Sequence, residues 1–178
     1  MFHAAGPGPE VPGPEVTVRR LRRSDDAAVQ ALVDACGASV LDVLASGEQP
    51  RDALLVRLAV PLDADPESKR AWGVERAGRL VGLMEGLMHH PGPGECLIRA
   101  FALHPRVRGH GLATSAARFM LAQARHRGIT SVEVLYRHTD LAQRSVLRSL
   151  GFLLDESPDE DRSDPSPPGF RSARLALR

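Results

Sequence analysis

The residues best suited to chemistry form a basic, glycine-rich segment in the second half of the chain. Arg106 and Arg108 precede a Gly109-His110-Gly111 turn, and apolar residues at helical spacing follow it. Glycine has no β-carbon, so backbone N–H groups can come close to a ligand. The first turn of a helix has N–H groups without helical partners and a partial positive charge. Guanidinium groups add forked donors that match phosphate. The segment therefore predicts a diphosphate bound at a helix N-terminus.

Known phosphate-binding loops fit this segment to different degrees. A Walker loop needs Gly-Lys-Ser/Thr after its glycines, and the sequence has no such tripeptide. The dinucleotide-binding fingerprint of oxidoreductases needs a third glycine where Thr114 stands, and it should follow the first strand of its domain. The pattern Arg/Gln-x-x-Gly-x-Gly/Ala fits at every defined position from Arg106 to Gly111. The sequence therefore resembles the Gcn5-related N-acetyltransferases (GNAT), which carry this pattern in their acyl-CoA loop. A basic connection that binds nothing is the structural alternative.

The elements expected around the loop follow the order found in that family. Apolar periodicity predicts strands at 15–22, 72–76, 80–88, 96–103, 131–136 and 172–177, of which 72–76 and 80–88 form a hairpin. It also predicts a helix capped by Ser24, a helix around 54–59, a helix that begins at Leu112, and a helix capped by Asp140 with Gln143 placed as in a capping box. The resemblance implies an α/β (α+β) GNAT fold. Its central sheet is mixed and mostly antiparallel, is flanked by helices, and has a splayed parallel strand pair at the acyl-CoA site.

The resemblance covers one expected N-acetyltransferase domain at residues 15–178. Residues 1–14 are rich in Gly and Pro and have few apolar residues, so we expect a flexible N-terminal tail there. No second domain is visible in the sequence pattern.

A second segment, which ends at Gly151-Phe152, is similar to the family's other signature, Asn-x-x-Ala-x-x-Leu-Tyr-x-x-x-Gly-Phe. Asp140 replaces the Asn and Gln143 replaces the Ala. Leu147 stands where the family usually has the Tyr that protonates the departing thiol. A coenzyme A thiol is similar to a Cys thiol, with a pKa near 8.5, so it can leave as a thiolate. A dedicated acid is therefore useful but not obligatory.

The resemblance also implies the cofactor, acetyl-CoA, and the residues that hold it. Phe101 and Leu103 lie where family members pair the strand backbone with the pantetheine amides. The residues implied around the diphosphate are Arg106, Arg108, Gly109, His110, Gly111, Ala113 and Thr114.

Glu85 is the candidate general base. It lies in an apolar strand, on the same face as Val81, Leu83 and Leu87. A carboxylate among apolar groups has a raised pKa, which suits a base. The alternatives are an ion pair with Arg99 on the neighbouring strand, or exposure to solvent. Other candidate bases, expected to be exposed, are Glu95 and Glu133.

Tyr136 is the candidate acid, because it is the only Tyr and ends the strand expected to run parallel to 96–103. Its alternative role is to fill the core. Ser145 and Ser149 are weaker candidates, since helix positions of this kind are usually solvated.

The amino-acid composition limits which binding partners and which cellular compartment we expect for this chain. The chain has 178 residues and a net charge of +1, with one Trp and one Tyr. The chain therefore has neither a strong positive electrostatic field nor a set of aromatic side chains with which to bind nucleic acid. No apolar run is long enough to span a membrane. Cys36 and Cys96 match no metal spacing, and His89-His90 has no nearby Cys or paired acid, so no metal is expected. We expect a cytoplasmic protein.

Three functions remain for such a chain. The first is transfer of an acetyl group to an amine acceptor, either a small molecule or a protein N-terminus. The second is a non-catalytic acyl-CoA-binding or sensor module of the same fold. The third is a dinucleotide-binding oxidoreductase, which predicts stabilisation by NAD and not by coenzyme A. The sequence leaves open whether the chain forms a homodimer.

Overall fold

The computed structural model describes residues 16–37, 60–61, 64–156 and 169–178. The expected tail at 1–14 and the expected helix around 54–59 lie outside these residues. Among the described residues, seven strands form one sheet in the order β1-β2-β3-β4-β5-β7-β6. The strands are β1 (Thr17–Arg20), β2 (Lys69–Arg76), β3 (Arg79–Met88), β4 (Glu95–Leu103), β5 (Ser131–Arg137), β6 (Leu153–Leu154) and β7 (Phe170–Ala176).

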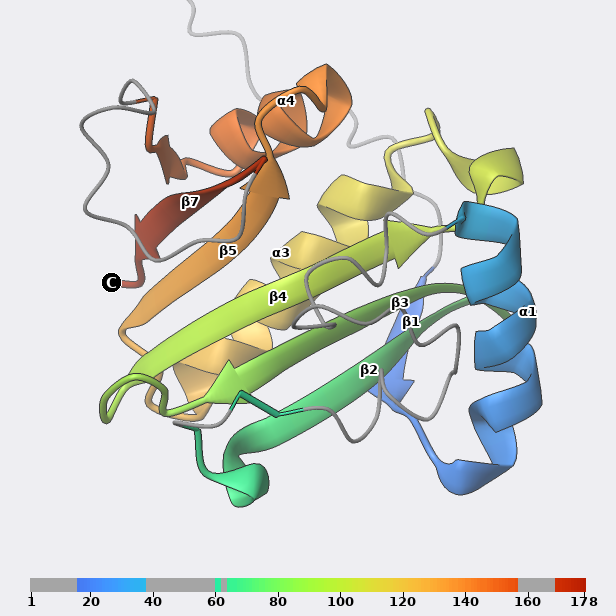
Figure 1. Ribbon diagram of the computed structural model, residues 1–178, viewed down its shortest axis with the longest axis horizontal. Coiled ribbons are helices and arrows are strands. Elements are labelled where there is room, and N and C mark those ends of the chain that lie inside the picture. The colour runs from blue at the N-terminus through green and yellow to red at the C-terminus, as the bar shows by residue number, and fades with distance from the viewer. Residues whose placement is uncertain (1–15, 38–59, 62–63, 157–168) are drawn as a thin grey trace, which may run out of the picture.

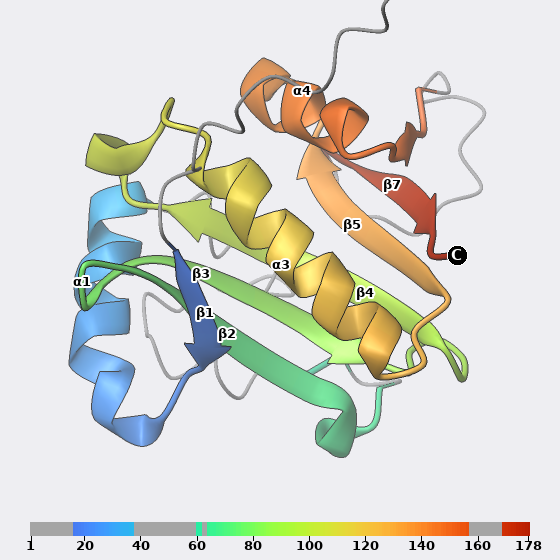
Figure 2. The ribbon, with the colours of Figure 1, turned by 180° about the vertical axis from the view of Figure 1, so that it is seen from behind.

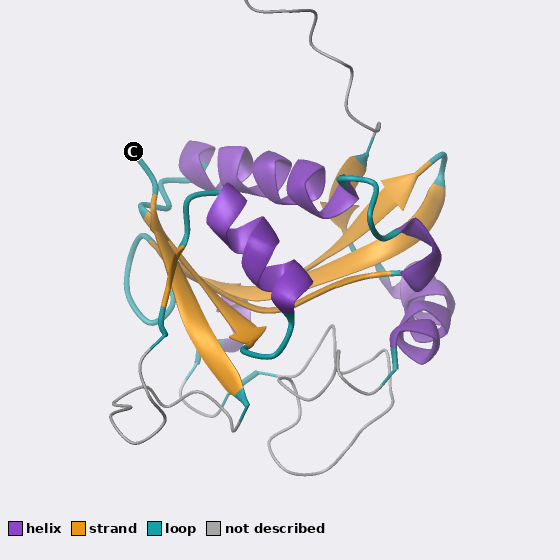
Figure 3. Ribbon diagram, turned by 90° about the horizontal axis from the view of Figure 1, so that it is seen from above, coloured by secondary structure: helices purple, strands orange, loops and turns teal. Residues whose placement is uncertain are grey.

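Helices cover both faces of this sheet. Helix α1 (Asp26–Cys36) lies on one face and α3 (Leu112–His126) crosses the other, while α4 (Leu141–Ser149) follows β5. Figure 1 shows α1 in front of the sheet, and Figure 2 shows α3 running diagonally across its back. Figure 3, seen from above, shows how strongly the sheet twists between them. The mixed α/β architecture with flanking helices confirms the expected fold.

Two apolar clusters fill the two layers. The larger one lies on the α3 side and contains Trp72, Met84, Ile98, Ala116 and Val134, among other buried residues. The smaller one joins α1 to the opposite face of β3 and β4 through Val29, Leu32, Val33, Leu83, Ala100 and Ala102. Alternating side chains of the same strands thus supply both layers, as the two-residue repeat of a strand requires.

The pair β4–β5 is the one parallel pairing among the described strands. Its register runs from Glu95 opposite Ser131 to Ile98 opposite Val134 and then stops. Both strands continue, because β4 extends to Leu103 and β5 pairs with β7 as far as Arg137. The backbone of the last part of β4 therefore has no strand partner on its β5 side. This confirms the expected splayed pair.

A β-bulge lies at the point of separation. Glu85 on β3 is opposite Ala100, whereas the next residue, Gly86, is opposite Ile98, so Arg99 is the extra residue on β4. A bulge bends the strand and changes the direction of a side chain. Here it helps to turn the end of β4 away from β5.

The start of α1 differs from expectation. Ser24 was expected to cap the helix, but it lies within a short 3₁₀ helix (Arg23–Asp25), and α1 begins at Asp26. Asp25 is the N-cap residue of α1 but makes no side-chain cap hydrogen bond to that helix. Its Oδ2 instead accepts from the Arg22 backbone N–H at 2.7 Å, within the capping box of the 3₁₀ helix. Arg19 binds both oxygens of Asp25, at 2.8 and 2.9 Å. The contact with Arg19 on β1 therefore holds Asp25, and not Ser24, at the start of α1.

The Asp25 contacts predict a pH-dependent contribution to stability. The hydrogen bond from Arg19 lowers the pKa of Asp25 to about 2. A depressed pKa gives stability that is present above the unfolded value near 4 and is lost as the pH falls through 2. We expect Asp25→Asn to cost about 1–2 kcal/mol at pH 7, allowing for partial exposure, and little at pH 2. Urea unfolding at several pH values measures this.

Asp34 provides the matched control for that experiment. It lies on the same helix, where it is exposed and accepts a hydrogen bond from Gln30 at 3.0 Å. Asp34→Asn should change the free energy of unfolding by less than about 0.5 kcal/mol at either pH. Equal losses for the two variants, or a loss for Asp25→Asn that does not depend on pH, would contradict the prediction.

No helix among the described residues combines the length and the apolar character that a membrane span requires.

Candidate active site

A cleft of about 480 Å³ opens where β4 and β5 separate. Its walls come from the end of β4, the following loop, the first turn of α3, the end of β5 and the first turns of α4. The cleft brings together seven of the nine cofactor residues expected from sequence: Phe101, Leu103, Arg108, Gly109, Gly111, Ala113 and Thr114. Arg106 and His110 are not among its described lining residues. Both are exposed, and the His110 ring bonds to the Arg108 carbonyl at 2.8 Å.

The loop glycines leave space for a ligand. Gly109 and Gly111 have φ angles of 80° and 74°, in the left-handed region. A β-carbon built on either glycine meets no protein atom within 4 Å. Packing within the protein therefore does not require glycine at these positions, whereas the backbone conformation favours it and the space beside the backbone is open.

The N-terminus of α3 presents free donors to the same cleft. The first helical hydrogen bond runs from Ser115 N to Gly111 O at 3.0 Å. The N–H groups of Leu112, Ala113 and Thr114 precede it and have no helical acceptor. With Arg108 beside them, these groups form a cationic, donor-rich surface that fits a diphosphate. The residues present therefore match the coenzyme A group that the loop pattern implies.

Arg108 is held in place by the end of β4. Its Nε donates to the Leu103 carbonyl at 3.0 Å, and the Cys36 thiol of α1 donates to the same oxygen at 3.4 Å. Burial raises the pKa of the Cys36 thiol, although Arg108 acts in the opposite direction. Cys36 thus joins α1 to the wall of the cleft as a neutral thiol. No local pattern predicts this contact, because its partners are 67 positions apart in the chain.

Residues from β5 and β7 line the far wall, and sequence reasoning missed them. Leu135 and Arg137 face the cleft, and the Arg137 guanidinium lies 4.7 Å from the centre of the Phe170 ring. The alternation of β5 was a usable signal, because Leu135 and Arg137 must lie on the face opposite Tyr136.

Asp140 and Gln143 line the cleft at the start of α4. The Asp140 side chain accepts from Gln143 N at 2.9 Å, which confirms the expected cap. The Gln143 side chain does not complete a capping box, because its oxygen accepts from Arg137 N at 3.3 Å instead. These contacts join α4 to the end of β5. The second signature segment therefore forms part of the cleft.

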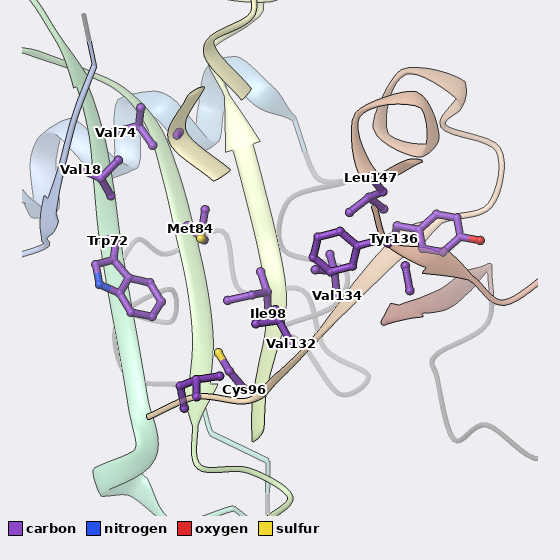
Figure 4. Close-up of a cluster of buried hydrophobic side chains, with 14 of the residues drawn as sticks. Val18, Trp72, Val74, Met84, Cys96, Ile98, Val132, Val134, Tyr136 and Leu147 are labelled. Atoms are coloured by element: carbon purple, nitrogen blue, oxygen red, sulfur yellow. The ribbon is translucent and has the colours of Figure 1, made fainter. Parts of the chain in front are cut away.

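Tyr136 does not line this cleft. It is 1% exposed, and its hydroxyl donates to the Asp155 carbonyl at 3.0 Å. Figure 4 shows the Tyr136 side chain close to the buried Leu147, with its phenol oxygen directed away from β4. Burial raises the pKa of the hydroxyl. The structure thus places Tyr136 in the core, the alternative noted from sequence, and its expected role as an acid stays a prediction.

Glu85 lies in a buried cluster of charges. Its side chain has no exposed surface, and Arg99 contacts both of its oxygens, with Nη2–Oε1 at 2.9 Å and Nε–Oε2 at 3.2 Å. Lys69 on β2 also binds Oε1. Burial lowers the pKa of Lys69 to about 8, although Glu85 acts in the opposite direction. The ion pair with Arg99 that was noted as an alternative is confirmed, and the role of Glu85 as a base stays a prediction.

Glu85 nevertheless contacts a residue that lines the cleft. Arg99 is the bulge residue of β4 and lines the cleft next to the point where the strands separate. Contacts with both oxygens of the Glu85 carboxylate hold this guanidinium in one orientation. Any role of Arg99 toward a bound molecule therefore depends on Glu85.

Comparisons with solved structures show the same fold at low sequence identity. The GNAT domain of S. lividans PAT superposes with a TM-score of 0.65 and 14% identity, over 90% of this chain and 89% of that chain. The ribosomal-protein-S18-alanine N-acetyltransferase from Escherichia coli gives 0.63 and 14%, over 92% and 94%. The PaiA N-acetyltransferase from Thermoplasma acidophilum, solved with coenzyme A, gives 0.63 and 12%, over 91% and 99%.

The curated proteins contain no match to the sequence. The sequence model of the acetyltransferase (GNAT) family, in contrast, matches residues 41–152. This range includes the two strands that separate, the glycine loop, α3 and α4. The protein belongs to the GNAT family of acetyltransferases.

Proposed function

We propose that this protein transfers an acetyl group from acetyl-CoA to a primary amine, on a small molecule or at a protein N-terminus. One observation carries the proposal. The free N–H groups of α3, the two open glycines and the unpaired end of β4 all border a single cleft. A diphosphate on the helix N-terminus would hold the rest of the cofactor beside the unpaired strand.

The described residues divide the work of binding. Gly109, Gly111 and the first turn of α3 would bind the diphosphate through backbone N–H groups, with Arg108 supplying positive charge. Phe101 and Leu103 lie on the part of β4 that β5 leaves unpaired, where backbone groups can bind the pantetheine amides. A backbone N–H of the same strand would stabilise the developing oxyanion.

When bound, acetyl-CoA supplies the acyl group: a C–N bond to the acceptor forms while the C–S bond breaks, the amine loses one proton and the thiolate departs. An alkyl amine has a pKa near 10.4, so most of it is protonated at pH 7 and must first lose a proton. Glu85 remains our candidate base, with Tyr136 the sequence-based candidate acid.

A non-catalytic acyl-CoA-binding module is the second candidate function. It is favoured by the buried Leu147, at the position where the family usually has Tyr, and by the Tyr136 hydroxyl, which bonds to Asp155 away from the cleft. Such a module needs only the binding half of the site.

Thiol release with a panel of amines separates the two functions. The enzyme should release coenzyme A from acetyl-CoA only when an acceptor is present, and calorimetry should detect binding of coenzyme A. Binding without release across small amines and N-terminal peptides would favour the module. Stabilisation by NAD, and none by coenzyme A, would contradict both and favour an oxidoreductase.

A further inference from the structure

A second cavity lies on the α3 side of the sheet, next to the cleft. It has a volume of about 300 Å³, and most of its lining is apolar. Met84, Ile98 and Val134 line it from the strands, and Ala117 and Leu147 line it from α3 and α4. No part of the site described above uses this space.

The cavity adjoins the cleft near the point where the acyl group is expected. Phe101, Gln143 and Val146 line both spaces. Ile98 and Val134 are the last paired residues before β4 and β5 separate, and both line the cavity. Figure 4 shows these two side chains projecting into the same cluster from neighbouring strands. A thioester held between the separating strands would therefore have the cavity on one side.

The volume and the apolar lining of the cavity favour an apolar occupant. An apolar cavity of about 150 Å³ is large enough to bind benzene, and this one has about twice that volume. The apolar walls of an unfilled space lack packing contacts on one side. An alkyl chain would restore those contacts without burying a polar group.

We propose that the preferred donor is an acyl-CoA whose chain is longer than acetyl, of about six carbons, with the chain in this apolar cavity. The inference rests on the proposed transfer from a coenzyme A thioester to an amine, and it names a longer acyl group, in place of acetyl, as the preferred group. The diphosphate and pantetheine contacts stay the same for every donor, so the chain alone sets the preference among donors.

Calorimetry with coenzyme A, acetyl-CoA, butanoyl-CoA and hexanoyl-CoA tests the proposal. We expect affinity to rise along the series, with hexanoyl-CoA at least tenfold tighter than acetyl-CoA. Equal affinities for acetyl-CoA and hexanoyl-CoA, or weaker binding of hexanoyl-CoA, would overturn the acyl-chain proposal. Absence of binding by every member of the series, coenzyme A included, would instead overturn the proposed function.

Two variants test where the chain lies. Val134→Phe fills the cavity from β5, and Ala117→Leu fills it from α3, so a folding defect in one still leaves the other. Each should reduce the ratio of hexanoyl-CoA to acetyl-CoA affinity at least fivefold while acetyl-CoA affinity stays within twofold. An unchanged ratio in a folded variant would place the chain elsewhere and overturn the assignment.

Discussion

Gly111→Val should weaken coenzyme A binding about 100-fold, measured by calorimetry. A β-carbon at Gly111 enters space that no protein atom occupies, at the start of α3 and inside the cleft. It would keep a diphosphate away from the N–H groups of the first turn. Losing two charge-assisted hydrogen bonds of about 1.5 kcal/mol each corresponds to about 100-fold in affinity.

Gly128→Val is the matched control, because the backbone strain is nearly the same. Gly128 has a φ of 75° against 74° for Gly111, and a β-carbon there also meets nothing within 4 Å. It follows the other end of α3 and is not among the described residues that line the cleft. Both variants should lose about 1–2 kcal/mol of stability, but Gly128→Val should bind coenzyme A normally. Equal losses of affinity would show that strain, and not the blocked site, is responsible.

Glu85→Gln should lower the free energy of unfolding by about 3 kcal/mol, because it breaks a buried ion pair with Arg99 and Lys69. For a chain of this length, the melting temperature should fall by about 6–12 °C. Coenzyme A affinity should be spared, because Glu85 is not among the described residues that line the cleft, and Arg99, which is, is not among the residues proposed to bind coenzyme A.

Glu133→Gln provides the comparison on the surface. Glu133 pairs with Arg174 at 3.1 Å, but the Arg174 side chain is 70% exposed. Its loss should cost less than about 1 kcal/mol, because solvent screens such a pair. Similar destabilisation by the two variants would contradict the expected effect of burial.

The turnover of Glu85→Gln then separates the two roles of this carboxylate. A general base contributes about 10²–10⁴-fold to the rate, so its loss should lower kcat by at least about 100-fold. A fall of less than tenfold would rule out the base and leave Glu85 as the residue that positions Arg99. The assay belongs at a temperature where circular dichroism shows the variant to be folded.

Local sequence determined the parts of this protein that depend on neighbouring residues. The hairpin between β2 and β3, the glycine loop, the start of α3 and the Asp140 cap all formed where the pattern predicted them. Each depends on interactions within a few positions, such as left-handed glycines, first-turn donors or an alternating apolar face. The loop and the helix N-terminus proposed to bind coenzyme A could therefore be located from the chain itself.

Tertiary structure decided which side chains meet across the sheet. The sequence placed Glu85 on an apolar face, but the bulge at Arg99 and the register with β2 surrounded it with two cations. The role of Tyr136 was also undecided at the level of sequence. The pairing of β5 with β7 brings its hydroxyl to the Asp155 carbonyl. Strand register and bulges arise from contacts between segments far apart in the chain. Local patterns do not contain that information, so the roles of these two residues could not be decided from sequence.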